Sequence, residues 1–266
     1  VEADISNGLP AFDIVGLPDA AVKESRDRVR AAIKNCGFKF PVSRITVNLA
    51  PADRKKEGSA YDLPVLLAIL KASGQLNAEM ESTVAVGEVA LDGILRGING
   101  VLAMTITAKE NGVENIFVPQ ENAIEAAVVE GINVYPATDV KQIIAHLTGE
   151  KPIEKQPLTP AKSQNPVRVP DFCDVKGQVA AKKALEVAAA GGHNIILVGP
   201  PGAGKSMLAK RLPGILPDMT FAESIETTKI HSIAGILDSK NPFVSHRPFR
   251  SPHHTVSVAG MAGGGA

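Results

Sequence analysis

Apolar positions in the first half of the chain switch between a helical repeat and strict alternation. Val22, Val29 and Ile33 recur at helical spacing after Asp19 and before Gly37, which predicts an amphipathic helix with a start and a stop signal. The same reasoning predicts strands at Arg44–Leu49, Val84–Val89, Ile116–Val118 and Ile132–Tyr135, and helices at Asp62–Ser73, Val101–Lys109, Ala123–Val129 and Val140–His146.

Proline and polar residues then interrupt this pattern. The stretch Thr148–Arg168 carries four prolines and no apolar repeat, so it predicts an extended, semi-rigid linker. We therefore expect one domain over residues 1–148, a linker over 149–168 and a second domain over 169–266 that is held apart from the first.

The second domain begins with a helix and a short apolar run. A helix is predicted at Gln178–Ala190, a buried parallel strand at Asn194–Val198, and a further helix at Lys205–Leu212. Strands that alternate with helices in both halves place the chain in the α/β class.

Between the predicted strand and the helix lies a phosphate-binding motif. The residues Gly199, Pro200, Pro201, Gly202, Ala203, Gly204, Lys205 and Ser206 match G-x-x-x-x-G-K-[ST] at every fixed position. Glycines let successive backbone N–H groups turn toward a phosphate, which a Cβ would obstruct. We expect Lys205 to contact the β and γ phosphates of ATP and the Ser206 hydroxyl to coordinate Mg²⁺.

Hydrolysis needs a further carboxylate at the end of a second apolar strand. The nearest candidate, Ile236–Asp238, is short and follows a glycine, so an ordinary turn is the favoured interpretation. The chain starts without methionine and ends in the glycine-rich stretch Gly260–Ala266, for which we expect a flexible tail. These features suggest a fragment that lacks the hydrolytic half of the nucleotide domain.

Charge is distributed unevenly although the net charge is zero. Residues 1–150 hold 14 Lys and Arg against 20 Asp and Glu, whereas residues 151–266 hold 14 against 8. No acid occurs from Ser239 to the end, where Arg247, Arg250, His253 and His254 lie. These four residues are our candidates for nucleic-acid contacts. A metal site, or a loop positioned by histidine hydrogen bonds, is an alternative for the histidines.

Composition excludes several classes of protein. With 44% hydrophobic and 21% charged residues, the chain is neither disordered nor fibrous. Its longest apolar run falls far short of the roughly 20 residues that cross a bilayer. Only Cys36 and Cys173 occur, which argues against a secreted disulfide scaffold. We expect a cytoplasmic protein without a membrane segment.

Six stretches of the sequence carry a joint resemblance: Ser6–Phe12, Ile14–Pro18, Val22–Arg30, Ile45–Asp53, Gly199–Ser206 and Arg247–His254. Together they span nearly the whole chain and resemble one family, the magnesium-chelatase-like AAA+ ATPases of the YifB/ComM type. The resemblance implies a Lon-protease-like α+β domain at the N-terminus, followed by a truncated P-loop AAA+ α/β domain. The 247–254 region looks like the insertion that faces the ring channel in chelatase-type proteins.

The resemblance also implies a function. It suggests a Mg²⁺-dependent ATPase that works as a hexameric, homo-oligomeric ring, with ATP and DNA as partners, and that drives DNA branch migration in recombination or natural transformation. The alternative is a remodelling chaperone or a magnesium-chelatase-type motor that does not act on DNA.

A Lon-like domain raises the question of peptidase activity. The stretch that resembles the Lon nucleophile motif, Lys56–Ala60, has Ala60 in place of the serine, with Ser59 one position early. The stretch that resembles the lysine motif has Leu102 in place of the lysine. A serine without a base stays a neutral hydroxyl, so we expect no protease activity.

Overall fold

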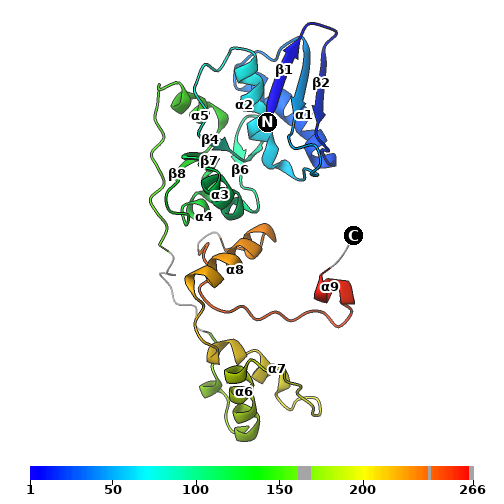
Figure 1. Ribbon diagram of the computed structural model, residues 1–266, viewed down its shortest axis with the longest axis vertical. Coiled ribbons are helices and arrows are strands. Elements are labelled where there is room, and N and C mark those ends of the chain that lie inside the picture. The colour runs from blue at the N-terminus through cyan, green and yellow to red at the C-terminus, as the bar shows by residue number, and fades with distance from the viewer. Residues whose placement is uncertain (161–168, 239–240, 264–266) are drawn as a thin grey trace. The chain divides into compact units, whose positions relative to one another are not determined.

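The computed structural model describes residues 1–160, 169–238 and 241–263, and its contacts divide the chain into two compact units (Figure 1). Unit 1 comprises Val1–Ala161 with Glu226–Phe243, and unit 2 comprises Lys162–Ile225 with Val244–Ala266. Glu226–Phe243 thus belongs to the first unit, although it lies within the second domain predicted from the sequence. The family-domain boundaries at 1–148 and 169–266 themselves stay a prediction.

The first sheet of unit 1 has the strand order β1-β3-β2. Its strands are β1 (Glu2–Ser6), β2 (Ala11–Val15) and β3 (Arg44–Asn48). β3 pairs antiparallel with β1 and parallel with β2. The predicted strand at 44–49 is thus confirmed, and it is the central strand of its sheet.

Helix α1 (Ala20–Asn35) crosses between the two parallel strands of this sheet. The Asp19 side chain accepts the Val22 N–H at 2.7 Å and so caps the helix. The chain leaves the helix at Gly37, whose φ of +90° suits glycine. Both predicted boundary signals are confirmed.

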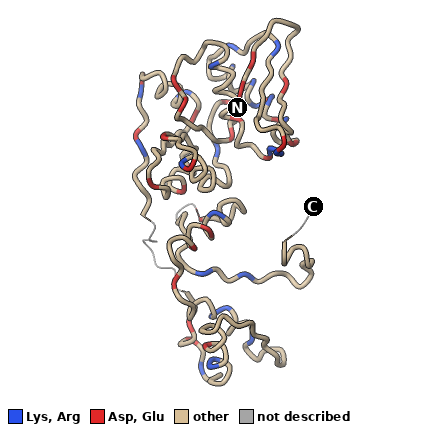
Figure 2. Tube along the Cα trace, viewed as in Figure 1, with Lys and Arg blue, Asp and Glu red and all other residues tan. Residues whose placement is uncertain are grey.

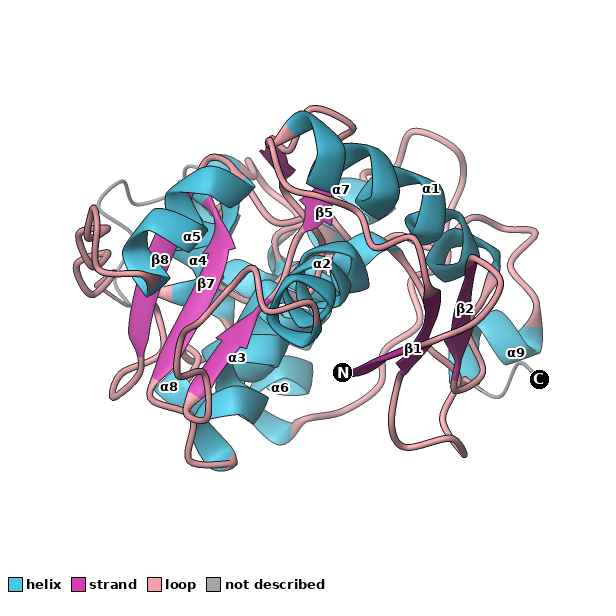
Figure 3. Cartoon of the chain, turned by 90° about the horizontal axis from the view of Figure 1, so that it is seen from above, coloured by secondary structure: helices cyan, strands magenta, loops and turns pink. Residues whose placement is uncertain are grey.

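Helix α2 (Asp62–Ala72) lies between the two sheets of unit 1 and contacts β1 on one side and β4 on the other (Figure 3). Because it is covered on several sides, its apolar residues are not confined to one stripe. Six of them are buried: Leu63, Val65, Leu66, Leu67, Ile69 and Leu70.

The second sheet is parallel and has the order β4-β7-β8. Its strands are β4 (Thr83–Ala85), β7 (Asn115–Pro119) and β8 (Asn133–Ala137). The helices that accompany it are α3 (Val101–Glu110), α4 (Ala123–Ala126) and α5 (Val140–Leu147). Strands β7 and β8 and helices α3 and α5 agree with the predicted elements to within two residues at each end, whereas α4 is shorter than predicted. The whole domain is mixed α/β with parallel pairing.

The single strand predicted at Val84–Val89 is wrong. The structure has β4 in the parallel sheet and β5 (Glu88–Val89) in a hairpin with β6 (Leu95–Arg96). Val86 still donates to the Phe117 carbonyl, but the N–H of Gly87 turns to Ala60 at 3.2 Å and its carbonyl accepts from Leu63. The φ of +155° at Gly87 permits this change of direction.

The described part of the predicted linker packs on unit 1. Ile153 is buried, Gln156 N–H donates to Val134 O at 2.8 Å and Thr159 N–H donates to Ala127 O at 2.9 Å. This stretch is extended, as predicted, but it belongs to the first unit. The remainder, residues 161–168, lies outside the described residues.

Helices predominate in the later part of the chain. They are α6 (Val179–Gly191), α7 (Lys205–Ala209), α8 (Phe221–Ile233) and α9 (Val258–Ala262), with 3₁₀ turns at Phe172–Asp174 and Leu212–Ile215. Two further 3₁₀ turns, Ser59–Tyr61 and Gln120–Asn122, lie in the first half of the chain. The predicted helix at 205–212 ends early, and α9 occupies part of the expected flexible tail. Residues 264–266 of that tail lie outside the description.

The buried strand predicted at Asn194–Val198 is wrong. The segment is irregular, with Ile196 at 85% and Val198 at 88% exposure. A parallel strand is stable only between neighbouring strands, and every strand of the described residues lies before residue 138, in unit 1. The apolar run therefore has no sheet to join.

In the described residues, no helix combines the length and the apolar character that a bilayer crossing requires.

Candidate functional site

The phosphate-loop motif forms a tight loop that runs into α7. Gly202 and Gly204 adopt φ of +80° and +86°, a conformation that L side chains rarely take. A Cβ on Gly204 would also lie 3.3 Å from the Met207 Cε. The motif's last two glycines are therefore required by backbone geometry.

The Lys205 ammonium lies inside this loop. Its Nζ donates to Gly199 O at 2.7 Å and to Pro200 O at 2.8 Å, so the first and last parts of the motif are bridged by one side chain. Ser206 follows on α7 and is exposed. The arrangement brings the eight predicted residues together as one loop with a cation at its centre.

Neighbouring helices of unit 2 hold the loop from both sides. The Gln178 amide, at the start of α6, donates to Ala203 O at 3.3 Å. On α7, Leu208 is buried against a small apolar core that contains Phe172, Val175 and Leu185. The helix behind the loop is therefore anchored although the segment before it has no sheet.

A second anchor uses charge. Arg211 donates from Nε to the Asp171 carbonyl at 3.1 Å and lies 4.0 Å from the Asp174 carboxylate. The Asp171 side chain accepts the Cys173 N–H at 2.7 Å, and hydrogen bonds to Cys173 lower the pKa of this carboxyl. These contacts tie the end of the loop helix to the 3₁₀ turn that opens unit 2.

The alternative carboxylate candidate, at the end of Ile236–Asp238, does not end a strand. Ile236 and Leu237 lie in no helix or strand, and Asp238 O accepts the Asn241 N–H at 3.0 Å in an isolated bridge. Asp238 belongs to unit 1 by its contacts, whereas the phosphate loop belongs to unit 2.

The basic candidates near the end of the chain differ in their surroundings. Arg247 donates to Pro217 O at 2.8 Å and pairs with Glu223 at 3.3 Å. Hydrogen bonds from Thr220, followed by those from Arg247, lower the pKa of Glu223. Arg250 is exposed. Arg247 is thus held within unit 2, whereas Arg250 points to solvent.

The two adjacent histidines are exposed and lie close together. The rings of His253 and His254 are 4.1 Å apart, and His253 Nδ1 lies 2.7 Å from the Thr255 hydroxyl. Among the described residues no group of three or more His, Cys, Asp or Glu side chains is placed to hold a metal ion. Of the three alternatives, the hydrogen-bonded loop has a contact to support it.

The stretches that resemble Lon motifs hold no serine and lysine at the catalytic positions. Ala60 lies in the 3₁₀ turn before α2, and Leu102 is fully buried on α3. Lys56 is buried and donates to the Pro51 carbonyl, so its ammonium is bound to backbone.

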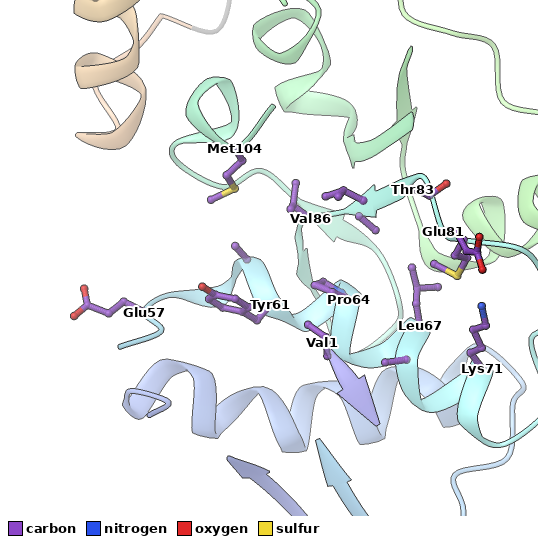
Figure 4. Close-up of a pocket in the computed structure, with 15 residues that line it drawn as sticks. Val1, Glu57, Tyr61, Pro64, Leu67, Lys71, Glu81, Thr83, Val86 and Met104 are labelled. Carbon is purple, nitrogen blue, oxygen red and sulfur yellow. The ribbon is translucent and has the colours of Figure 1, made fainter. Parts of the chain in front are cut away.

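A cavity that the sequence does not predict lies beside Ala60. It has a volume of about 590 Å³ and lies between α2 and β4, with Tyr61, Pro64 and Leu67 facing Val86 (Figure 4). Burial, the largest cause, raises the pKa of the Tyr61 hydroxyl. No local pattern reveals this cavity, because its walls come from segments that only the fold brings together.

Comparison with known proteins identifies the class. Residues 1–122 match the family described as subunit ChlI of Mg-chelatase, and residues 171–266 match magnesium chelatase, subunit ChlI. The phosphate loop lies inside the second match. The chain therefore belongs to the magnesium-chelatase-like proteins, which have AAA+-type domains.

Individual relatives narrow this assignment. YifB of Salmonella typhimurium is 46% identical over 267 residues, which is 100% of this chain and 52% of that protein. The competence protein ComM of Haemophilus influenzae is 44% identical over 276 residues, again 100% and 52%. The chain is thus a YifB/ComM-like protein, and it spans about half the length of the curated relatives it matches.

A more distant similarity covers the first half. Lon protease of Mycolicibacterium smegmatis is 28% identical over 158 residues, 54% of this chain and 20% of that protein.

Proposed function

We propose that unit 2 binds ATP and Mg²⁺ and that the whole protein is an ATP-driven motor. The observation that carries this proposal is the Lys205 ammonium at the centre of a loop whose glycines hold positive φ. In this geometry two carbonyl groups hold the Lys205 ammonium inside the loop. There its positive charge supports the binding of a phosphate group.

The residues of the loop fit a triphosphate and its metal ion. In the proposed complex, backbone N–H groups of the loop that make no internal hydrogen bond would donate to the phosphate oxygens, and Lys205 would move from its two carbonyl partners to the β and γ oxygens. The Ala203 N–H already donates to Pro200 O at 3.3 Å. The Ser206 hydroxyl, exposed beside the loop, would hold Mg²⁺, which would supply positive charge to the phosphates. The glycines keep side-chain carbon away from this surface.

The test compares a substitution of the loop lysine with a substitution of a second lysine that serves as a matched control. Lys205→Ala removes the ammonium from the loop, whereas Lys210→Ala removes the same group from an exposed position at the end of α7. We expect ATP affinity to fall about tenfold or more in the first variant, since a hydrogen bond to a charged group contributes roughly 1.5–3 kcal/mol. Titration calorimetry with Mg²⁺ and a slowly hydrolysed ATP analogue measures it. Equal affinity in both variants would refute the phosphate assignment.

We further propose that the motor acts on DNA as a branch-migration helicase. The basic, acid-free sequence from Ser239 onward and the exposed Arg250 support this, as does the similarity to a protein named for competence. Arg247, His253 and His254 complete the proposed contact region, which neutralises phosphates rather than reading bases.

The second candidate is a chelatase-type or protein-remodelling motor, favoured by the family description itself. Filter binding of branched and single-stranded DNA across a salt series discriminates between the two. If the protein is a DNA motor, its affinity for DNA falls steeply with salt and is weakened by Arg250→Gln. If it is a chelatase-type motor, the unaltered chain and the Arg250→Gln variant bind DNA equally weakly.

We propose that unit 1 has a Lon-protease-like fold but does not cleave peptides. The similarity to Lon proteases over the first half supports the fold, and Ala60 and Leu102 at the motif positions argue against peptide cleavage. Fold alone does not carry function. We place the complete protein in the cytoplasm as a homo-oligomeric, hexameric ring in which unit 1 serves assembly or binding.

A further inference from the structure

Helix α1 carries a stripe of positive charge on one face. Lys23, Arg26, Arg30 and Lys34 follow each other at intervals of three or four residues, and all four are exposed. Such intervals place side chains above one another along a helix. The intervening Arg28 faces elsewhere and binds Asp62 at 2.7 Å.

Two aromatic rings lie beside this stripe. Phe12 of β2 and Phe40, which follows α1, are half-buried, with ring centroids 5.7 Å apart. The guanidinium of Arg30 lies over the Phe40 ring at 5.4 Å from its centroid, a cation–π contact. Arg26 donates to the Phe12 carbonyl at 3.4 Å. Cations and rings are thereby fixed in one surface.

Between them the surface is hollowed. A cavity of about 390 Å³ is bordered by the last three cations of the stripe, by both rings and by the segment Pro41–Ser43. Val42 is 82% exposed, which adds an apolar edge to the hollow. We call Phe12, Arg26, Arg30, Lys34 and Phe40 the α1 patch.

The charge of the α1 patch is local. Three cations and a single acid, Asp27, border the cavity, although residues 1–150 as a whole carry six more acids than bases. Among the described residues, Arg26, Arg30 and Lys34 take part in no ion pair with an acidic side chain. These three charges are thus available to an anion. Figure 2 marks the Lys and Arg positions of the chain in blue and the acidic positions in red.

We propose that the α1 patch binds single-stranded nucleic acid. Arg26, Arg30 and Lys34 succeed one another at about 6 Å along the helix axis, a spacing comparable with that of successive phosphates in an unstacked strand. The rings of Phe12 and Phe40 offer apolar, aromatic surface to a base, and stacking on aromatic side chains in a positive groove is the usual mode of sequence-tolerant single-strand binding.

The aromatic component decides between nucleic acid and an acidic peptide. Carboxylates would satisfy the cations but would leave the two rings and Val42 in water, whereas a nucleotide supplies a phosphate and a base together. The assignment of a biological role to the patch rests on the proposed action on DNA. The binding itself needs neither ATP nor unit 2.

The experiment measures binding of a fluorescein-labelled oligothymidylate by anisotropy, without ATP, on the full chain. The double variant Arg26→Gln/Lys34→Gln is compared with Lys109→Gln/Lys141→Gln, which removes the same charge from exposed positions of α3 and α5. We expect only the first to weaken binding and to reduce the salt slope by about 1.4, since each phosphate contact on a single strand contributes roughly 0.7.

Phe40→Leu tests the stacking. It retains an apolar side chain against the core, and we expect it to weaken binding about fivefold or more, the lower end of the effect of losing one base–aromatic stack. The circular dichroism melting curve of each variant is recorded beside its affinity, so that a loss of binding is accepted only with an unchanged fold. Phe38→Leu, which alters a core-packed ring that does not border the cavity, serves as its control.

Two results would overturn the proposal. One is equal loss of affinity in the two double variants, which would indicate general charge screening. The other is displacement of the oligonucleotide by polyglutamate at the same charge concentration, with Phe40→Leu unaffected, which would indicate an acidic-peptide surface. Because the Lys205→Ala titration with ATP is separate, either failure is distinct from failure of the proposed nucleotide site.

Discussion

At the residue scale, the carboxylate of Asp62 is a central determinant of unit 1. It is fully buried and accepts hydrogen bonds from Arg28 Nε at 2.7 Å, from Arg28 Nη2 at 3.0 Å and from Val89 N–H at 3.3 Å. We expect Asp62→Asn to lower the free energy of unfolding by about 3 kcal/mol, since breaking a buried ion pair leaves an uncompensated partner. Urea unfolding followed by circular dichroism measures it.

The control for this prediction alters the other acid beside the same arginine. Glu24 lies 3.9 Å from Arg28 and its side chain is 74% exposed, so Glu24→Gln is expected to cost less than about 0.5 kcal/mol. Similar losses in the two variants would contradict the role assigned to Asp62.

Sequence alone predicts some residues of the site and not others, for a physical reason. The loop from Gly199 to Ser206 is contiguous, and its glycines and lysine are required at fixed spacing. The conformation of this loop can therefore be predicted from the local sequence. The α1 patch and the cavity beside Ala60 combine segments from different elements. Their side chains meet only after the sheets and helices of unit 1 have packed.

At the scale of elements, the predicted periodicities hold wherever an element has partners in the chain. Helices α1 and α2 and strand β3 lie where the sequence predicts them because caps, glycine stops and apolar faces act locally. The two strand predictions that are wrong, Val84–Val89 and Asn194–Val198, depend on contacts with distant parts of the chain. In the first, Gly87 redirects the chain toward α2, and in the second, a strand-like sequence meets no neighbouring strand.

Helix α5 and the segment after it are coupled through His146. Its Nδ1 accepts the Ile153 N–H at 2.8 Å, its ring packs 4.6 Å from that of Tyr135, and burial lowers its pKa from 6.5. Because the unfolded state then binds the proton more tightly, the contribution of His146 to stability is fully present above pH 6.5. It is lost as the pH falls from there toward the folded-state pKa.

We therefore expect urea midpoints of unit 1 to fall as the pH is lowered through 6.5, and amide exchange at Ile153 to increase with them. His146→Gln is expected to be less stable throughout, because the ring contacts are lost, but to show a shallower dependence on pH. An unchanged pH profile in this variant would assign the effect to other groups.

At the scale of the whole molecule, the two units differ greatly in the core that each can bury. Unit 1 has a large apolar core around α2, whereas the core behind the phosphate loop in unit 2 consists of Phe172, Val175, Leu185 and Leu208. Stability follows buried apolar surface, so we expect thermal unfolding of the chain in two steps, with unit 2 unfolding first.

Nucleotide binding distinguishes the two steps. A ligand that binds only the folded state stabilises it by about 2.7 kcal/mol at a hundredfold excess over its Kd. ATP with Mg²⁺ is therefore expected to raise the lower transition and leave the upper one unchanged, and Lys205→Ala is expected to abolish the rise. Differential scanning calorimetry, with limited proteolysis between the two transitions to identify the resistant unit, measures both effects. A rise in the upper transition alone would place the nucleotide on unit 1, contrary to the proposal, because Lys205 and its loop belong to unit 2.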